Sequence, residues 1–261
     1  MRHCLAPIAL VIGLLAARTA GAHDTWFQPE AGGATRDIVM ALGTGNRYPV
    51  QEFPLAIEQL RQNGCRAGAA PAVSLSKAAD TAHALIVRAA PQVEAGQAVT
   101  CWAQLAPMDI ELPPDKVRVY LREINASPAT LAAWADMRQR GVAWKERYTK
   151  HARIEFAGSA APARPVDMGM DIVLESGLQA IAAGDPLVFQ VLRDGAPLAD
   201  FPVELCSERQ RLGVWRRTDG EGRIRIPAPP AGRWVLRGTD LRLSEGDTWE
   251  SRFVTLAFSV K

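Results

Sequence analysis

The chain has 261 residues, and its 30 lysines and arginines against 28 aspartates and glutamates give a formal net charge of +2. An N-terminal leader, if removed, takes Arg2 and Arg18 and no acidic residue with it, so the remaining charge is zero. A chain without excess positive charge gives no electrostatic reason to bind nucleic acid or an anionic membrane, so we expect neither partner.

The N-terminus is typical of an export signal. A basic start precedes an apolar run over residues 5–17, which is too short to stay as a membrane anchor. Ala20 and Ala22 place small side chains where signal peptidase requires them, so we expect cleavage after Ala22 and a periplasmic protein that begins at His23. Cleavage after Ala20 would put Arg18 where a small side chain is needed, and is the lesser alternative.

Three of the four cysteines follow the expected leader. An exported chain meets an oxidising compartment, so a disulfide is plausible. Cys65 and Cys101 lie in the same half of the chain, and we expect them to pair and Cys206 to remain as a buried thiol on a strand. No CxxC spacing occurs, which gives no support to a thiolate zinc site or to thioredoxin-like chemistry.

Residues 23–158 are predicted to form a β-rich domain with one helix. Ser127 can cap that helix and Gly141 can end it, which places it at about 128–140. Residues 151–156 alternate between polar and apolar side chains, and this alternation places His151 on the outer face of a strand. A short helix is expected at 54–61, and strands are expected at 37–42, 82–88, 98–105, 116–122 and 151–156.

Residues 159–165 are rich in alanine and proline, as a linker is, and residues 166–261 follow as a second domain. Short apolar segments there are separated by glycine turns such as Asp194-Gly195, a spacing that predicts a β-sandwich. The whole chain is therefore predicted to be mainly β, with two sandwich-like domains and one helical insertion in the first.

Two resemblances add to this prediction. Residues 193–203, 218–223 and 230–234 (RDGAPLADFPV, TDGEGR and PAGRW) resemble the transthyretin-like or carboxypeptidase-regulatory-like β-sandwich over roughly residues 185–261. Together with the leader ending in residues 22–26 (AHDTW), the chain resembles a bacterial family built on a domain of unknown function. Some members of that family accompany nickel and cobalt uptake systems. The resemblance implies a periplasmic protein that binds or delivers a transition metal, with a membrane metal transporter as partner.

A free N-terminal histidine can hold a metal ion through two nitrogens of one residue. Its α-amine has a typical pKa of about 7.7 to 8.0 and its imidazole one of about 6.5, so both lose a proton readily near neutral pH. Such donors favour nickel, cobalt or copper over calcium or magnesium. His23 is the first candidate ligand, and His83 and His151 are candidates for a further imidazole. Asp24 is a candidate acceptor for an imidazole N–H.

Two other functions stay open. A non-catalytic surface or adhesion sandwich would make His23 incidental. A copper-dependent oxidative enzyme is the other alternative, because such enzymes also bind their metal with an N-terminal histidine. The chain contains no recognisable catalytic motif of the G-x-S-x-G or H-E-x-x-H kind, so the sequence favours a protein without enzymatic activity.

Overall fold

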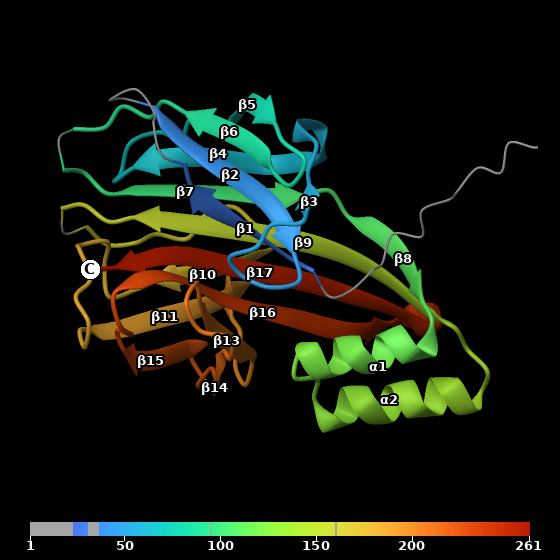
Figure 1. The fold of residues 1–261 in the computed structure, drawn as a ribbon. Helices are drawn as coiled ribbons and strands as arrows, with labels where there is room; N and C mark the ends of the chain where they lie inside the picture. Colours follow the sequence, from blue (N-terminus) through green and yellow to red (C-terminus); the bar gives the residue numbers. More distant parts are fainter. Residues whose placement is uncertain (1–22, 31–36, 95, 160) are drawn as a thin grey trace, which may run out of the picture.

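The computed structural model describes residues 23–30, 37–94, 96–159 and 161–261 (Figure 1). The predicted leader and its cleavage after Ala22 lie outside the described residues. Within them the chain folds into three sheets and two α-helices. The predicted fold class, mainly β with sandwich-like packing and a small helical insertion, is confirmed.

The central sheet runs through the middle of the molecule and draws strands from both halves of the sequence (Figure 1). Its order is β14 (Val214–Arg217), β13 (Pro202–Ser207), β16 (Gly232–Ser244), β17 (Thr248–Val260), β9 (Trp144–Phe156), β7 (Val99–Leu105) and β4 (Leu60–Ala67), with β8 (Met108–Leu112) also paired to β9. β9 and β17 lie parallel, with Glu146 opposite Trp249 and Ile154 opposite Ala257. One sheet therefore joins residues 23–158 to residues 166–261, and their division into two domains stays a prediction.

The end of the segment predicted as a linker is hydrogen-bonded to the central sheet. Arg66 of β4 donates hydrogen bonds to the carbonyl oxygens of Arg164 and Pro165, at 2.7 and 3.0 Å. Arg153 of β9 reaches the Arg164 carbonyl as well, at 3.1 Å. These contacts hold residues 164 and 165 against the sheet.

The N-terminal sheet covers one face of the central sheet. It is formed by β1 (Asp24–Pro29), β2 (Ile38–Gly45), β6 (Leu85–Ala89) and β5 (Ser76–Asp80), with the short β3 (Phe53–Pro54) on β2. Phe27 and Met40 pack with Ile154 in the core between the two sheets. The predicted helix at 54–61 is wrong: only a 3-10 turn, η1 (Ile57–Gln59), forms, because the chain enters β4 at residue 60.

The third sheet covers the opposite face. It contains β10 (Met170–Leu174), β11 (Pro186–Arg193), β12 (Ala196–Pro197) and β15 (Arg223–Pro227). Ile172 and Phe189 pack with Val254 and Leu256 of β17 in a second core. The central sheet is thus buried on both faces over most of its length.

Two helices cover the end of the central sheet that the N-terminal sheet leaves open (Figure 1). α2 (Pro128–Gln139) lies where the sequence predicts a helix, and the hydroxyl of Ser127 accepts the Thr130 N–H at 3.1 Å as its cap. The strand predicted at 116–122 is wrong, because this segment lies in α1 (Pro114–Glu123). Val117, Tyr120 and Leu121 have the i, i+3, i+4 spacing of a helix, and all three are buried.

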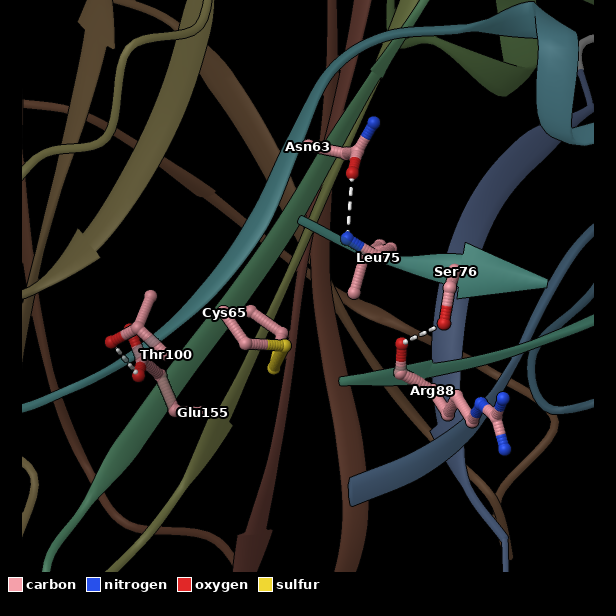
Figure 2. The surroundings of a disulfide bond; sticks show 8 residues. Asn63, Cys65, Leu75, Ser76, Arg88, Thr100 and Glu155 are labelled. Carbon is pink, nitrogen blue, oxygen red and sulfur yellow. Dashed lines mark hydrogen bonds between the residues drawn. A yellow bond between two sulfur atoms is a disulfide. The ribbon is translucent and has the colours of Figure 1, made fainter. Parts of the chain in front are cut away.

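Cys65 and Cys101 form a disulfide between β4 and β7, where they lie opposite each other (Figure 2). Cys206 lies on β13, is partly buried and is the free cysteine of the part of the chain that is described. Burial raises the pKa of its thiol to about 12, so it is held as the unreactive thiol at neutral pH.

Candidate functional site

The start of β1 and the loop after β2 form the candidate site. β1 and β2 are antiparallel with Asp24 opposite Gly45, and this register brings His23 beside Asn46. The His23 ring also contacts the Phe53 ring, with 4.8 Å between centroids. The imidazole is half-buried by this surrounding.

His23 is held as a neutral imidazole. Burial lowers its pKa below the ordinary value, and the nearby ammonium of Lys150 lowers it further. The carboxylate of Glu52, a hydrogen bond that the ring donates to the Asn46 side chain and the carboxylate of Asp24 act in the opposite direction, more weakly. A neutral imidazole is the form that binds metal ions, so the ring is available as a ligand at neutral pH.

Glu52 and Asn46 form an exposed polar pair next to His23. The Oε2 atom of Glu52 accepts the backbone N–H of Asn46 at 2.7 Å and its side-chain N–H at 2.9 Å. The backbone of Glu52 is held as well, because its N–H donates to the Thr44 carbonyl at 2.9 Å. Hydrogen bonds therefore fix the positions of both residues on the exposed side of the site.

Asp24 holds the N-terminal end of β1 in place through a buried ion pair. It is 4% exposed, and its carboxylate forms an ion pair with the guanidinium of Arg237 on β16. Arg237 also donates to Glu204 at 2.8 Å through Nε. The carboxylate that the sequence suggests as an acceptor for an imidazole is thus bound to an arginine, and its role toward a ligating histidine stays a prediction.

A small cavity lies under the same strand. It measures about 60 Å³, and Asp24, Trp26, Tyr48, Cys206 and Arg237 are among the residues that line it. Trp26 is 1% exposed, and its indole N–H has no hydrogen-bond partner among the described residues. The volume suits water molecules or a small ion rather than an organic substrate.

Lys150 is a buried cation close to His23. Its ammonium lies over the rings of Tyr148 and Phe253, at 5.4 and 5.9 Å from their centroids. Burial lowers the pKa of Lys150 to about 8, against the effect of the Asp24 and Glu146 carboxylates. In its charged form it repels a second cation at His23.

His83 lies in the turn before β6 and is exposed, because β6 begins at residue 85 and not at 82 as predicted. Its backbone N–H donates to the Thr81 hydroxyl at 3.2 Å. Its carbonyl oxygen would lie 2.9 Å from a Cβ atom on Gly43, which places the turn close to β2.

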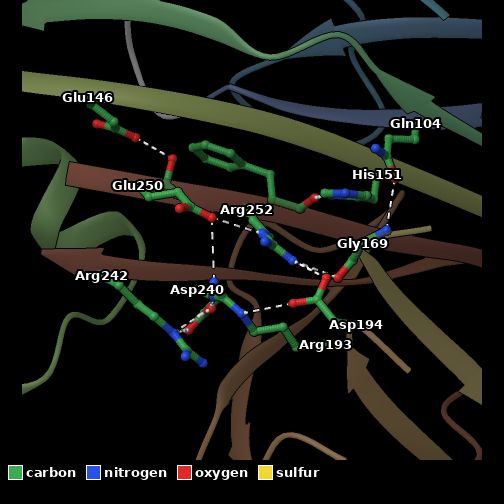
Figure 3. A network of polar contacts seen from close by, with 12 residues as sticks. Gln104, Glu146, His151, Gly169, Arg193, Asp194, Asp240, Arg242, Glu250 and Arg252 are labelled. Carbon is green, nitrogen blue, oxygen red and sulfur yellow. Dashed lines mark hydrogen bonds and ion pairs between the residues drawn. The ribbon is translucent and has the colours of Figure 1, made fainter. Parts of the chain in front are cut away.

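His151 lies on the other face of the central sheet, among Gln104, Gly169 and Arg252 (Figure 3). It is 1% exposed, and its Nδ1 lies 2.9 Å from the carbonyl oxygen of Phe253. Burial lowers the pKa of His151 to about 4, although the hydrogen bond to Phe253 opposes this. The outward position predicted for His151 is wrong, because the third sheet and the segment before β10 cover this face.

Within residues 23–30, 37–94, 96–159 and 161–261, no group of three histidine, cysteine, aspartate or glutamate side chains lies close enough to hold a metal ion. His23 and His151 are separated by the central sheet. Ligation by His23, His83 or His151 therefore stays a prediction. Asn46, Glu52 and Lys150 were not predicted from the sequence, because the pairing of β1 with β2 and the packing of β1 on β9 bring them to His23.

Residues 20–239 match a protein family described as a domain of unknown function (DUF4198). The chain belongs to this family. The DUF4198 match includes His23 and spans both halves of the sequence, which confirms the resemblance to a family of unknown function. No curated protein matches the sequence. None of the helices in the described part of this DUF4198 protein is long and apolar enough to cross a membrane.

Proposed function

We propose that this DUF4198 protein is a periplasmic carrier that takes up a nickel, cobalt or copper ion at His23, once the leader is removed, and passes it to a membrane transporter. The observation that carries the proposal is the placement of His23. Its ring is half-buried and neutral, and it stands at the first position before a strand whose first residue is anchored by a buried ion pair.

The position supports chelation because an N-terminal amine at His23 would be next to its own ring. The Asp24–Arg237 ion pair holds the residue that follows, and β1 packs on β9 and β17, where Thr255 donates to the Thr25 carbonyl at 2.7 Å. A rigid strand reduces the entropy that a chelating N-terminus loses on binding. Nitrogen donors of this kind select late transition metals.

The test uses the processed protein, with its first residue established by mass spectrometry. We expect one Ni(II), Co(II) or Cu(II) ion per chain by native mass spectrometry and calorimetry. The matched control carries one additional alanine before His23, which converts the amine into an amide and leaves the ring in place. Loss of binding in this control supports the proposal, whereas equal binding by both proteins contradicts it.

The same preparation separates the alternatives. A copper-dependent oxidative enzyme should consume reductant and oxygen when it is loaded with copper and given a polymer substrate. An adhesion module should bind its glycan or peptide equally well with His23 free or blocked. Metal binding that depends on the free amine, without turnover, is the result expected of a carrier.

A further inference from the structure

The chelate of His23 leaves an ion incompletely coordinated. The amine and the ring supply two nitrogens, and divalent late transition metals take four or more ligands. His151 is on the opposite face of the sheet and His83 is exposed in a separate turn. The loop that touches the His23 ring is therefore the nearest source of a third protein ligand.

Glu52 is the residue of that loop with a suitable donor. It directly precedes Phe53, whose ring contacts the His23 ring, and Phe53 lies opposite Thr44 on β2. The side-chain N–H of Asn46, the residue that the pairing of β1 with β2 brings beside His23, donates to the Glu52 carboxylate at 2.9 Å. The Glu52 carboxylate therefore lies in the surroundings of the ring.

One oxygen of Glu52 is used and the other is free. Oε2 accepts both N–H groups of Asn46, while Oε1 accepts no hydrogen bond and forms no ion pair within the part of the chain that the structure describes. Asn46 thus fixes the carboxylate and leaves one oxygen for a ligand. This arrangement is that of a ligating carboxylate held by an outer hydrogen bond.

We propose that Glu52 supplies the third protein ligand to the ion bound at His23, and that Asn46 is a positioning residue that holds the Glu52 carboxylate. This inference rests on the proposed function. Two nitrogens and one carboxylate oxygen suit a divalent ion, whereas Cu(I) prefers thiolate and thioether ligands. The ion carried is therefore divalent.

The experiment measures the affinity of the processed protein for Ni(II) and Co(II), together with the visible spectrum of the Co(II) complex. Glu52→Gln removes the charge at nearly constant shape, and Glu58→Gln removes an exposed glutamate of the same segment as a matched control. We expect Glu52→Gln to weaken binding at least about 10-fold and to shift the Co(II) bands, and Glu58→Gln to change neither.

Asn46→Ala is the second variant. It should weaken binding about 10-fold, and by no more than Glu52→Gln does, because the carboxylate is freed but not removed; Glu52→Gln in the same chain should then add little. A carboxylate that only stabilises the loop would alter the melting temperature of the metal-free protein and not the Co(II) spectrum.

The outcomes separate this inference from the proposed function. If the processed protein binds metal, the alanine-extended protein does not, and Glu52→Gln binds like the unaltered chain, then the assignment of Glu52 is overturned and the carrier function stands. If the processed protein binds none of these ions, both are overturned. Tight binding of Cu(I) that ignores Glu52→Gln also contradicts the proposed ligand set.

Discussion

Lys150 and His151 are consecutive residues of β9, yet their side chains lie on opposite faces of the central sheet. Lys150 faces the N-terminal sheet and lowers the pKa of His23, whereas His151 lies beside Gly169 and Arg252. Successive side chains of a strand alternate in this way. Only one of the two residues can therefore act on the candidate site, and the other reports on the stability of the fold.

We predict that His151 makes the fold sensitive to acid. Its pKa is about 4 in the folded protein and about 6.5 in an unfolded chain, so between these values only the unfolded state takes up the proton. The contribution of His151 to the free energy of unfolding is complete above about pH 6.5. It decreases by up to about 3 kcal/mol as the pH drops toward 4. Urea unfolding of His151→Asn between pH 7 and 4 should show a smaller decline.

The control for this prediction is His83→Asn, because His83 is an exposed histidine in a turn. It should leave the dependence of stability on pH unchanged. An equal decline in His151→Asn and in the unaltered protein would mean that His151 is not responsible for the loss of stability in acid.

The burial of His151 also shows what the sequence could not predict. Residues 151–156 alternate between charged and apolar side chains, which normally marks a strand with one face in solvent. Here Arg153 and Glu155 are buried, because Arg153 forms an ion pair with Asp171 at 2.8 Å under the third sheet. Charged residues that are paired in the core cannot be told from exposed ones by alternation alone.

The error at α1 has a related cause. The alternation of residues 116–122 fits a strand, but Val117, Tyr120 and Leu121 also fit one face of a helix, and Pro114 can start one. Tertiary contacts decided between the two patterns, because Tyr120 packs near the rings of Trp144 and Phe253. In contrast, α2 has a capping serine and a following glycine, and these local signals were sufficient.

The candidate site was predictable only in part. His23 could be predicted from the leader pattern, because the cleavage site is set by residues next to it in the sequence. Asn46 and Glu52 are distant in sequence and lie in a mixed loop that carries no motif. They reach His23 through the pairing of β1 with β2, and a single sequence does not define that register.

Removal of the disulfide should lower stability strongly. Cys65 and Cys101 are separated by 36 residues. Closing a loop of this length restricts the unfolded chain, so Cys65→Ala with Cys101→Ala should cost about 3 to 4 kcal/mol. Thermal unfolding should show the same lowered midpoint for the unaltered protein in strong reductant. Cys206→Ser serves as the control and should respond to reductant like the unaltered protein.

Breaking the buried ion pair under β1 should affect both stability and metal binding. Asp24→Asn leaves the guanidinium of Arg237 with Glu204 as its remaining carboxylate partner. We expect a loss of about 2 kcal/mol in urea unfolding, less than for a buried charge left wholly unpaired. Metal affinity should fall as well, because the N-terminus is less rigidly held.

The control for the ion pair is Asp247→Asn, which breaks an exposed pair with Arg140. Its unfolding midpoint should change little, because exposed ion pairs are weakened by solvent and salt. If the two variants are equally stable, then the Asp24–Arg237 pair does not anchor β1.

Lys150 should limit the affinity of the site for cations. Its ammonium lowers the pKa of His23, and it will repel a metal ion bound there for the same reason. We expect Lys150→Met to raise the affinity for Ni(II) about 10-fold at pH 7, where Lys150, with a pKa of about 8, is mostly charged. Lys150→Arg keeps the charge and should not increase the affinity. The gain in affinity of Lys150→Met should shrink above pH 9, because the unaltered lysine is then neutral too. A gain in affinity that is independent of pH would show that the lysine acts through packing and not through its charge.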